Sequence, residues 1–294
     1  MTDPDPGALA GLLDALDLTN TGDSRSEDIF IAPSQWTPGG RVFGGQVLAQ
    51  SLIAAGRTVP DDRPVHSMHG YFLRPGDAKK EITFSVDRIH DGRSFTTRRT
   101  QASQDGKPIL SMIASFQTED QGLEHQAAMP AGLPDPETLP STADVLAGID
   151  HPIALFWSTR RAFDIRHVES PIYFEASGER VPHQAVWMRA VGTLPDDPTL
   201  HRAALAYASD YSILESSLRA HGVAWGTPGL KVASLDHAMW WHRFGRVDEW
   251  MLYVQESPNA IGGRGLSLGR IYSRDGILLA SVAQEGTIRV PSAA

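Results

Sequence analysis

The segment DGKPILSMIASFQ, residues 105–117, aligns without a gap on DGILLASVAQEGT, residues 275–287. Each copy starts with an Asp-Gly turn signal and continues as an apolar run, which is typical of the second strand of a β-hairpin. About 170 residues separate the copies, a period that indicates a repeated structural unit. We therefore expect the chain to contain one such unit twice, the alternative being chance similarity between two hairpins.

The first unit is expected over residues 28–118. A short strand near Asp28 precedes FGGQVLAQSLIAAG, residues 43–56, whose apolar residues recur at helical spacing. This buried helix should begin near Gly44 or Gly45 and end at Gly56. Four strand-like runs follow, separated by turn signals, so the order predicts one helix lying on an antiparallel sheet.

The second unit, expected over residues 151–290, repeats that order. Its helix is expected in ASDYSILESSLRAHG, residues 208–222, and strand-like runs follow it. Residues 119–150 are rich in Pro, Gly, Asp and Ser, which is typical of a surface linker, and residues 1–27 are expected to form an N-terminal helix and lead-in. The expected fold class is therefore α+β, with two helix-wrapping antiparallel sheets joined edge to edge.

Bulk composition narrows the possible functions. The 35 acidic and 26 basic residues give a formal charge of -9, which disfavours broad binding to nucleic acid or to an anionic membrane. There is no cysteine, so disulfides, thiolate metal sites and a cysteine nucleophile are excluded. The first residues lack the pattern of a signal peptide, and no apolar run is long enough to span a membrane, so a cytoplasmic location is expected.

Six stretches of this chain together resemble the acyl-CoA thioesterase II family, in the family's order, over about residues 28–290. They are VFGGQV, HSMHGYFLRPGD, SFTTRR, ALAYASDY, LDHAMWWHR and VAQEGTIR. The resemblance implies a double-hotdog fold and hydrolysis of acyl-CoA to a free fatty acid and CoA, with no cofactor and no metal. It also implies a catalytic triad of Asp210, Ser234 and Gln284, although many bacterial members have threonine in place of Ser234.

Each of these three residues also has an ordinary structural interpretation. Asp210 stands at the start of the helix expected over residues 208–222, where it can take a proton from water or only cap the helix. Gln284 ends the apolar face of a strand, where its amide can position a water or can be satisfied within the core. The strand face of Ser234 is mixed, so its hydroxyl can contact that water or neighbouring backbone.

Gly44 and Gly45 open the expected helix of the first unit. Backbone N–H groups at a helix N-terminus can stabilise an oxyanion, and glycine would let the substrate approach them. Tight packing between helix and sheet is an equally good reason for glycine. If the oxyanion site is real, replacing Gly45 with valine should abolish turnover and leave the fold intact.

Other motifs are weaker. His66 is the best alternative general base, whereas the spacing of His237 and His242 does not suit a metal site. Ser267 lies in a literal G-x-S-x-G, but within a strand run and without the strand-turn-helix context of a nucleophile elbow. One apolar stretch can line an acyl tunnel or pack in the core: Met239, Trp240, Trp241, Trp250, Met251 and Leu252. Five basic residues can contact CoA phosphates or be solvated: Arg74, Lys79, Lys80, Arg243 and Arg246.

Two rival functions stay open from the sequence. The first is a non-catalytic acyl-CoA-binding protein on the same fold. The second is a hotdog enoyl-CoA hydratase that uses Asp236 and His237, although adjacent residues on a strand point to opposite faces. Acyl-CoA is the expected partner in each reading, and analogy with other hotdog proteins predicts a dimer or tetramer of the chain.

Overall fold

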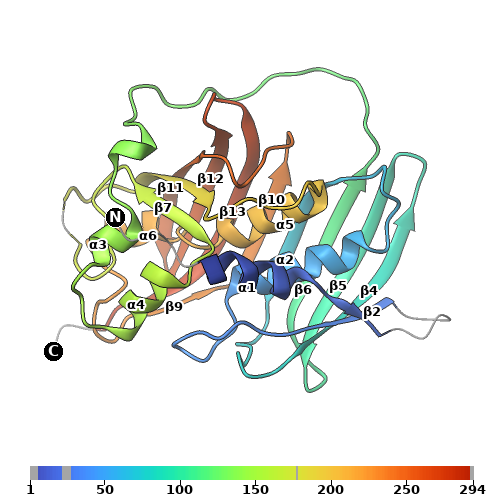
Figure 1. Ribbon diagram of the computed structural model, residues 1–294, viewed down its shortest axis with the longest axis horizontal. Coiled ribbons are helices and arrows are strands. Elements are labelled where there is room, and N and C mark those ends of the chain that lie inside the picture. The colour runs from blue at the N-terminus through green and yellow to red at the C-terminus, as the bar shows by residue number, and fades with distance from the viewer. Residues whose placement is uncertain (1–5, 22–27, 177, 292–294) are drawn as a thin grey trace.

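The computed structural model describes residues 6–21, 28–176 and 178–291. Within them, thirteen strands form one antiparallel sheet, with helices packed against it (Figure 1). The strands are β1 (Thr19–Asn20), β2 (Asp28–Ala32), β3 (Val65–Phe72), β4 (Ile82–Asp91), β5 (Phe95–Gln104), β6 (Lys107–Gln117), β7 (Phe163–His167), β8 (His183–Ala190), β9 (Lys231–Ser234), β10 (Asp236–Trp241), β11 (Met251–Ile261), β12 (Arg264–Ser273) and β13 (Leu278–Arg289). The helices are α1 (Pro6–Leu16), α2 (Gly44–Gly56), the 3-10 helix η1 (Pro136–Thr138), α3 (Thr142–Leu146), α4 (Pro152–Thr159), α5 (Pro198–Ser209) and α6 (Glu215–Ala220).

The sheet joins the two halves of the chain at one strand pair. Its order is β1-β2-β4-β5-β6-β3-β10-β13-β12-β11-β8-β7, and β9 pairs with the end of β13. Strands β3 and β10 run antiparallel, with Met68 opposite Met239. The expected fold class, with two antiparallel sheets joined edge to edge, is confirmed.

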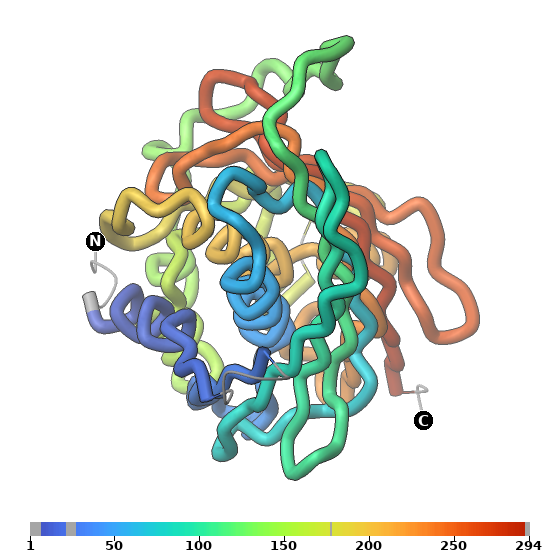
Figure 2. Tube along the Cα trace, turned by 90° about the vertical axis from the view of Figure 1, so that its right-hand side faces the viewer, coloured from blue at the N-terminus to red at the C-terminus, as the bar shows by residue number. Residues whose placement is uncertain are grey.

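Helix α2 crosses the strands of the first half and has the expected limits, Gly44 and Gly56. Its residues 45–55 are buried, and Figure 2 shows it, in light blue, running through the middle of the molecule beside the strands. In the second half α6 packs on β8, β11 and β12, while α5 packs against α2. The two halves therefore share helix packing as well as a strand pair.

The single helix expected over residues 208–222 is wrong. The structure has α5, which ends at Ser209, and α6, which begins at Glu215. Helix α5 starts earlier because the carboxylate of Asp197 accepts hydrogen bonds from the N–H groups of Thr199 and Leu200, and Pro198 occupies the first helical position. Asp210 consequently lies at the C-terminal end of α5, in the turn before α6.

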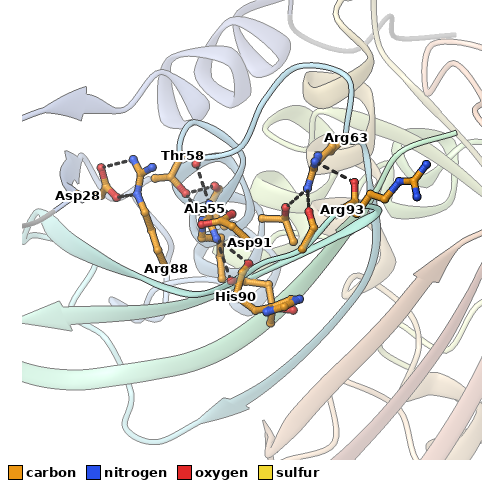
Figure 3. Close-up of polar contacts among 12 residues, drawn as sticks. Asp28, Ala55, Thr58, Arg63, Arg88, His90, Asp91 and Arg93 are labelled. Atoms are coloured by element: carbon orange, nitrogen blue, oxygen red, sulfur yellow. Dashed lines mark hydrogen bonds and ion pairs between the residues drawn. The ribbon is translucent and has the colours of Figure 1, made fainter.

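A buried arginine ties the far end of α2 to the sheet. Arg98 of β5 is 1% exposed and donates from Nε to Thr58 Oγ1 at 2.8 Å and from Nη2 to Asp91 Oδ1 at 2.7 Å. Figure 3 shows this group of contacts, with Thr58 just beyond α2 and His90 and Asp91 on the hairpin of β4 and β5. These contacts hold the C-terminal end of α2 against the sheet, while its N-terminal end, at Gly44, packs against α5.

Residues 119–150 cross between the halves along the top of Figure 1. They include η1 and α3 and pack over the sheet of the second half, where Trp187 Nε1 donates to Pro134 O and Trp250 Nε1 to Glu137 Oε1. None of the helices described is long and apolar enough to span a membrane.

Candidate active site

Three side chains meet where β9 and β13 approach the end of α5. Gln284 Nε2 donates to Asp210 Oδ1 and to Ser234 Oγ, each at 2.9 Å. The Ser234 hydroxyl makes a longer contact, 3.4 Å, to the same Asp210 oxygen. The structure therefore brings together the three residues proposed from the sequence, although Asp210 reaches them from the end of a helix and not from its start.

The other carboxylate oxygen of Asp210 binds the first half of the chain. The N–H of Gly45 donates to Asp210 Oδ2 at 2.8 Å, and the side chain of Phe43, the cap position of α2, provides no such bond. Asp210 thus caps the N-terminus of α2 from 165 positions away in the sequence. This helix end favours the charged carboxylate, and it belongs to a different helix from the one expected.

The pKa of Asp210 reflects two opposing effects. The pKa is raised from 3.8 to about 6, because burial raises it by more than the hydrogen bonds from Gln284, Gly45 and Ser234 lower it. A carboxyl group with a pKa near 6 is ionised at neutral pH and binds a proton more strongly than an ordinary aspartate. That is the property required of a general base.

A cavity of about 980 Å³ opens on this group. Asp210, Ser234 and Gln284 form part of its wall. The remaining wall combines the loop before α2, including Trp36, with α1 and α4 and with the aromatic side chains of Phe43, Phe72, Phe156, Trp157, Tyr207 and Tyr211. A largely apolar cavity with a few polar groups at one place is typical of a small-molecule site.

One of the two glycines expected to form the oxyanion site cannot do so. The N–H of Gly45 already binds Asp210 and is not free to stabilise an oxyanion. A Cβ at Gly45 would overlap the carbonyl oxygen of Tyr207. The expectation that a valine at position 45 would leave the fold intact is therefore wrong. Gly44 differs, because it lines the cavity and its N–H has no acceptor among the described residues.

Several other candidates from the sequence lie away from the cavity. His66 binds Ser115 Oγ from β3, and Ser267 is buried in β12, where Ser216 Oγ donates to it. The carboxylate of Asp236 accepts the N–H of Glu285. No group of three or more His, Cys, Asp or Glu side chains suited to a metal ion occurs within the described ranges.

The apolar stretch expected to line an acyl tunnel does not do so. Trp250 and Leu252 pack with Trp187 under the linker, and Met239, Trp241 and Met251 belong to the main core. The cavity aromatics instead come from α4, α5 and the segments that flank α2. Sequence reasoning missed them because the wall is made by side chains from many separate segments of the chain, and no single periodic pattern contains them.

The basic residues of the cavity were also only partly anticipated. Arg74 lines it, whereas Lys80 pairs with Asp105 and Arg246 pairs with Asp196 and Asp248. Arg41, Arg160 and Arg161 line it as well. The guanidinium of Arg161 lies 4.9 Å from the ring centroid of Trp157 and 5.0 Å from that of Tyr211.

Comparisons with known proteins agree with this architecture. Residues 158–287 match the family model described as acyl-CoA thioesterase, and residues 32–117 match that of the acyl-CoA thioesterase N-terminal domain. The chain is 38% identical over 267 residues to acyl-CoA thioesterase 2 of Haemophilus influenzae, covering 89% of this chain and 92% of that protein. It is 39% identical over 279 residues to human acyl-coenzyme A thioesterase 8, covering 90% of this chain and 85% of that protein.

Solved structures give the same result. An acyl-CoA thioesterase II from Mycobacterium marinum superposes with a TM-score of 0.75 at 40% identity, covering 96% of this chain and 98% of that one. A protein with a hot dog fold from Alicyclobacillus acidocaldarius superposes with a TM-score of 0.77 at 18% identity, covering 95% and 98% of the two chains, and shows the fold alone. The expected double-hotdog architecture is confirmed, and the chain belongs to the acyl-CoA thioesterase family.

Proposed function

We propose that this acyl-CoA thioesterase hydrolyses its substrate with a water molecule that Asp210 deprotonates and that Ser234 and Gln284 help to hold. The observation that carries the proposal is that three donors from both halves of the chain converge on one carboxylate in the cavity wall. Such convergence fixes the orientation of the carboxylate and keeps it ionised. An amide such as Gln284 can position water but cannot take its proton, so Asp210 is the base.

The hydrogen bonds of Asp210 leave a defined place for the water. A carboxylate has about four acceptor positions, and Gln284 and Ser234 use Oδ1 while Gly45 uses Oδ2. The remaining acceptor position lies on Oδ2, beside the start of α2. Ser234 and Gln284 help to hold a water there indirectly, by fixing the carboxylate, because their own protons already go to Asp210 and to Ser234 Oγ. Gly44 lines the cavity at the same helix end, and its N–H is the oxyanion donor of this proposal.

In the proposed reaction, water attacks the thioester directly, and no covalent enzyme intermediate forms. The water oxygen forms a bond to the thioester carbonyl carbon as its proton passes to Asp210. When the tetrahedral intermediate collapses, the carbon–sulfur bond breaks and the CoA thiolate takes the proton from Asp210. The products are a fatty acid and CoA, and Asp210 is again a carboxylate.

Replacing Asp210 with asparagine tests the proposal. We expect Asp210→Asn to lower kcat by roughly 100-fold or more and to change KM little, because a lost general base affects the transition state more than binding. Free CoA can be followed with a chromogenic disulfide across a series of acyl-CoAs. The protein adds no background because it has no cysteine.

Asp236→Asn is the matched control. Asp236 is a second carboxyl group whose pKa is raised by burial, but it does not line the cavity. It should therefore retain kcat within a few-fold. An Asp210→Asn enzyme with the kcat of the wild type would contradict the mechanism, and binding of acyl-CoA without CoA release by the wild type would favour the non-catalytic binding protein.

The hydratase alternative has less support. His237 is 0% exposed and neither it nor Asp236 lines the cavity, so this pair has no access to an enoyl-CoA.

Three sequence-based expectations stay predictions. The domain limits at residues 28–118 and 151–290 are supported by the strand order, in which β2–β6 and β7–β13 occupy opposite ends of the sheet, although β1, at Thr19–Asn20, extends the first half before residue 28. Assembly into a dimer or tetramer can be measured by analytical ultracentrifugation. A cytoplasmic location can be measured by cell fractionation.

A further inference from the structure

We propose that His237 is a positioning residue, which fixes the orientation of the Gln284 side-chain amide so that its NH₂ group faces Asp210. This inference rests on the function proposed above for Asp210, Ser234 and Gln284. It assigns a role to a histidine that sequence reasoning treated as structural.

His237 lies directly behind the site, away from the cavity. Its Nδ1 contacts Gln284 Oε1, and its Nε2 lies 3.0 Å from Ser209 Oγ at the end of α5. The amide of Gln284 is thus held on both sides, by His237 on its oxygen and by Asp210 and Ser234 on its nitrogen.

The chemistry of the two side chains fixes which atom donates. An amide oxygen only accepts, so His237 Nδ1 must carry a proton to bind Gln284 Oε1. If the proton were on Nε2 alone, Nδ1 would accept, and the amide would have to rotate to offer its NH₂ group to the histidine. Gln284 Oε1 would then face the Asp210 carboxylate, and the two acceptors would repel each other. The tautomer of His237 therefore determines whether Gln284 supports the ionised base.

The carboxylate of Asp210 selects this tautomer, because it can only accept and so requires the NH₂ group of Gln284, which leaves Gln284 Oε1 facing His237 Nδ1. Burial lowers the pKa of His237 to about 4, so the ring is neutral at the pH of catalysis and only one nitrogen carries a proton. With Nδ1 protonated, Nε2 can only accept, and Ser209 Oγ lies 3.0 Å from it. The Ser209 hydroxyl can donate either to Nε2 or to Ala206 O, which is 2.8 Å away within the helix, so Ser209 permits this tautomer without imposing it. The chain of donors runs from His237 through Gln284 to Asp210.

Within the described part of the chain, the charge of Asp210 acts on three tyrosines, Tyr207, Tyr211 and Tyr253. Burial raises the pKa of each, to about 12 for Tyr211, so none of the three changes charge near pH 6. Asp236, next to His237 on β10, binds the N–H of Glu285 instead. A change in the pH profile after substitution of His237 therefore reports on Asp210.

Two substitutions separate positioning from packing. His237→Leu removes the donor, so we expect kcat to fall about 10- to 100-fold, as with partners that orient directly acting groups, with KM nearly unchanged. The carboxylate loses a hydrogen bond that lowers its pKa, so the acidic limb of kcat/KM should move to higher pH. His237→Asn keeps an N–H near the position of Nδ1 and should restore most of kcat and the original limb.

His201→Asn is the matched control, because His201 is also buried on the α5 side and its pKa is also lowered by burial, but it contacts no triad residue. It should leave kcat and the acidic limb unchanged. Wild-type kcat in His237→Leu would overturn the proposal. Equal losses of kcat in His237→Leu and His237→Asn, with no shift in the acidic limb of the pH profile of kcat/KM, would overturn it as well.

The tautomer can also be measured directly in the unmodified enzyme. Long-range ¹H–¹⁵N correlation spectra of ¹⁵N-histidine-labelled protein should show His237 protonated on Nδ1. Protonation on Nε2 alone would overturn the proposal even if every variant failed to fold. This measurement does not depend on turnover, so it separates failure of the positioning role from failure of the Asp210 mechanism.

Discussion

At Asp210 the same burial that places the carboxylate against the substrate cavity opposes its ionisation. The donors Gln284, Ser234 and Gly45 offset much of this cost, and the balance leaves the pKa near 6. A lower pKa would give a weaker base, and a higher one would leave the group protonated at neutral pH. The hydrogen-bond set therefore tunes the reactivity of Asp210 as well as its position.

The raised pKa predicts two pH effects of Asp210. The base must be ionised, so kcat/KM should fall as the pH drops through about 6. Because the folded pKa lies above the unfolded value, the folded state binds the proton more tightly, and stability should decrease as the pH rises from about 4 to about 6. The decrease is at most about 3 kcal/mol.

The stability effect can be isolated by measuring unfolding in urea at pH 4.5 and at pH 7 for the wild type and for Asp210→Asn. The wild type should lose more stability than the variant over this interval. Equal losses in both proteins would contradict the raised pKa of Asp210.

At the level of elements, α2 and α5 approach each other so closely that only glycine fits at position 45. A Cβ there would overlap both Tyr207 O and the ring of Phe43. The close approach also lets Asp210, at the end of α5, reach the N-terminus of α2. The orientation of the Asp210 carboxylate therefore depends on how closely α2 and α5 pack.

Gly45→Ala should lower both stability and kcat. Overpacking of this kind costs about 1 to 3 kcal/mol, and displacement of α2 would weaken the Gly45 bond to Asp210. Gly56→Ala at the other end of the same helix is the control, because the nearest atom to its Cβ would be Thr199 Cγ2 at 3.6 Å. Thermal unfolding and thiol release should distinguish the two, and equal behaviour would show that the close approach is unimportant.

Much of the element order could be predicted because it depends on local patterns. The Asp105-Gly106 turn has positive φ at both residues, 50° and 72°, as a two-residue hairpin of this sequence favours. The glycines bounding α2 likewise marked its ends. By contrast, α5 was missed although Asp197-Pro198 is a strong start signal, because the apolar pattern that continues past Asp210 favoured one longer helix.

The site was also predictable in part from a local pattern. The strand parity of Gln284 indicated a buried amide, and the resemblance to a family selected Asp210 and Ser234 among many similar residues. The role of Gly45 and the contact between His237 and Gln284 depend on packing between distant segments. No local pattern encodes such contacts.

At the level of the whole molecule, the halves are held together by more than the covalent linker. The β3–β10 strand pair and the α2–α5 contact both cross between them. Residues 119–128 are exposed, whereas the linker is attached to the second half from Gln126 onward, where Gln126 Nε2 donates to Gly276 O.

Cutting the chain between residues 121 and 125 should therefore leave the enzyme assembled and active. A protease site inserted there can be cleaved and the product followed by gel filtration and thiol release, with the protease-treated wild type as the control. Co-elution of both fragments with unchanged kcat is expected. Separation of the fragments, or loss of activity on cleavage, would show that the linker itself holds the halves in place.

The repeat that defines the sheet also has an evolutionary consequence. In a dimer of two identical chains every substitution occurs twice, so both sites change together. In this chain the gapless alignment places Ala114, buried in β6, at the position of Gln284 in β13. Within one chain the two copies can differ: the second half contributes the proposed acid–base groups, and the first contributes a helix end. The stoichiometry should accordingly be one catalytic centre for each chain, half of what two equivalent copies would provide.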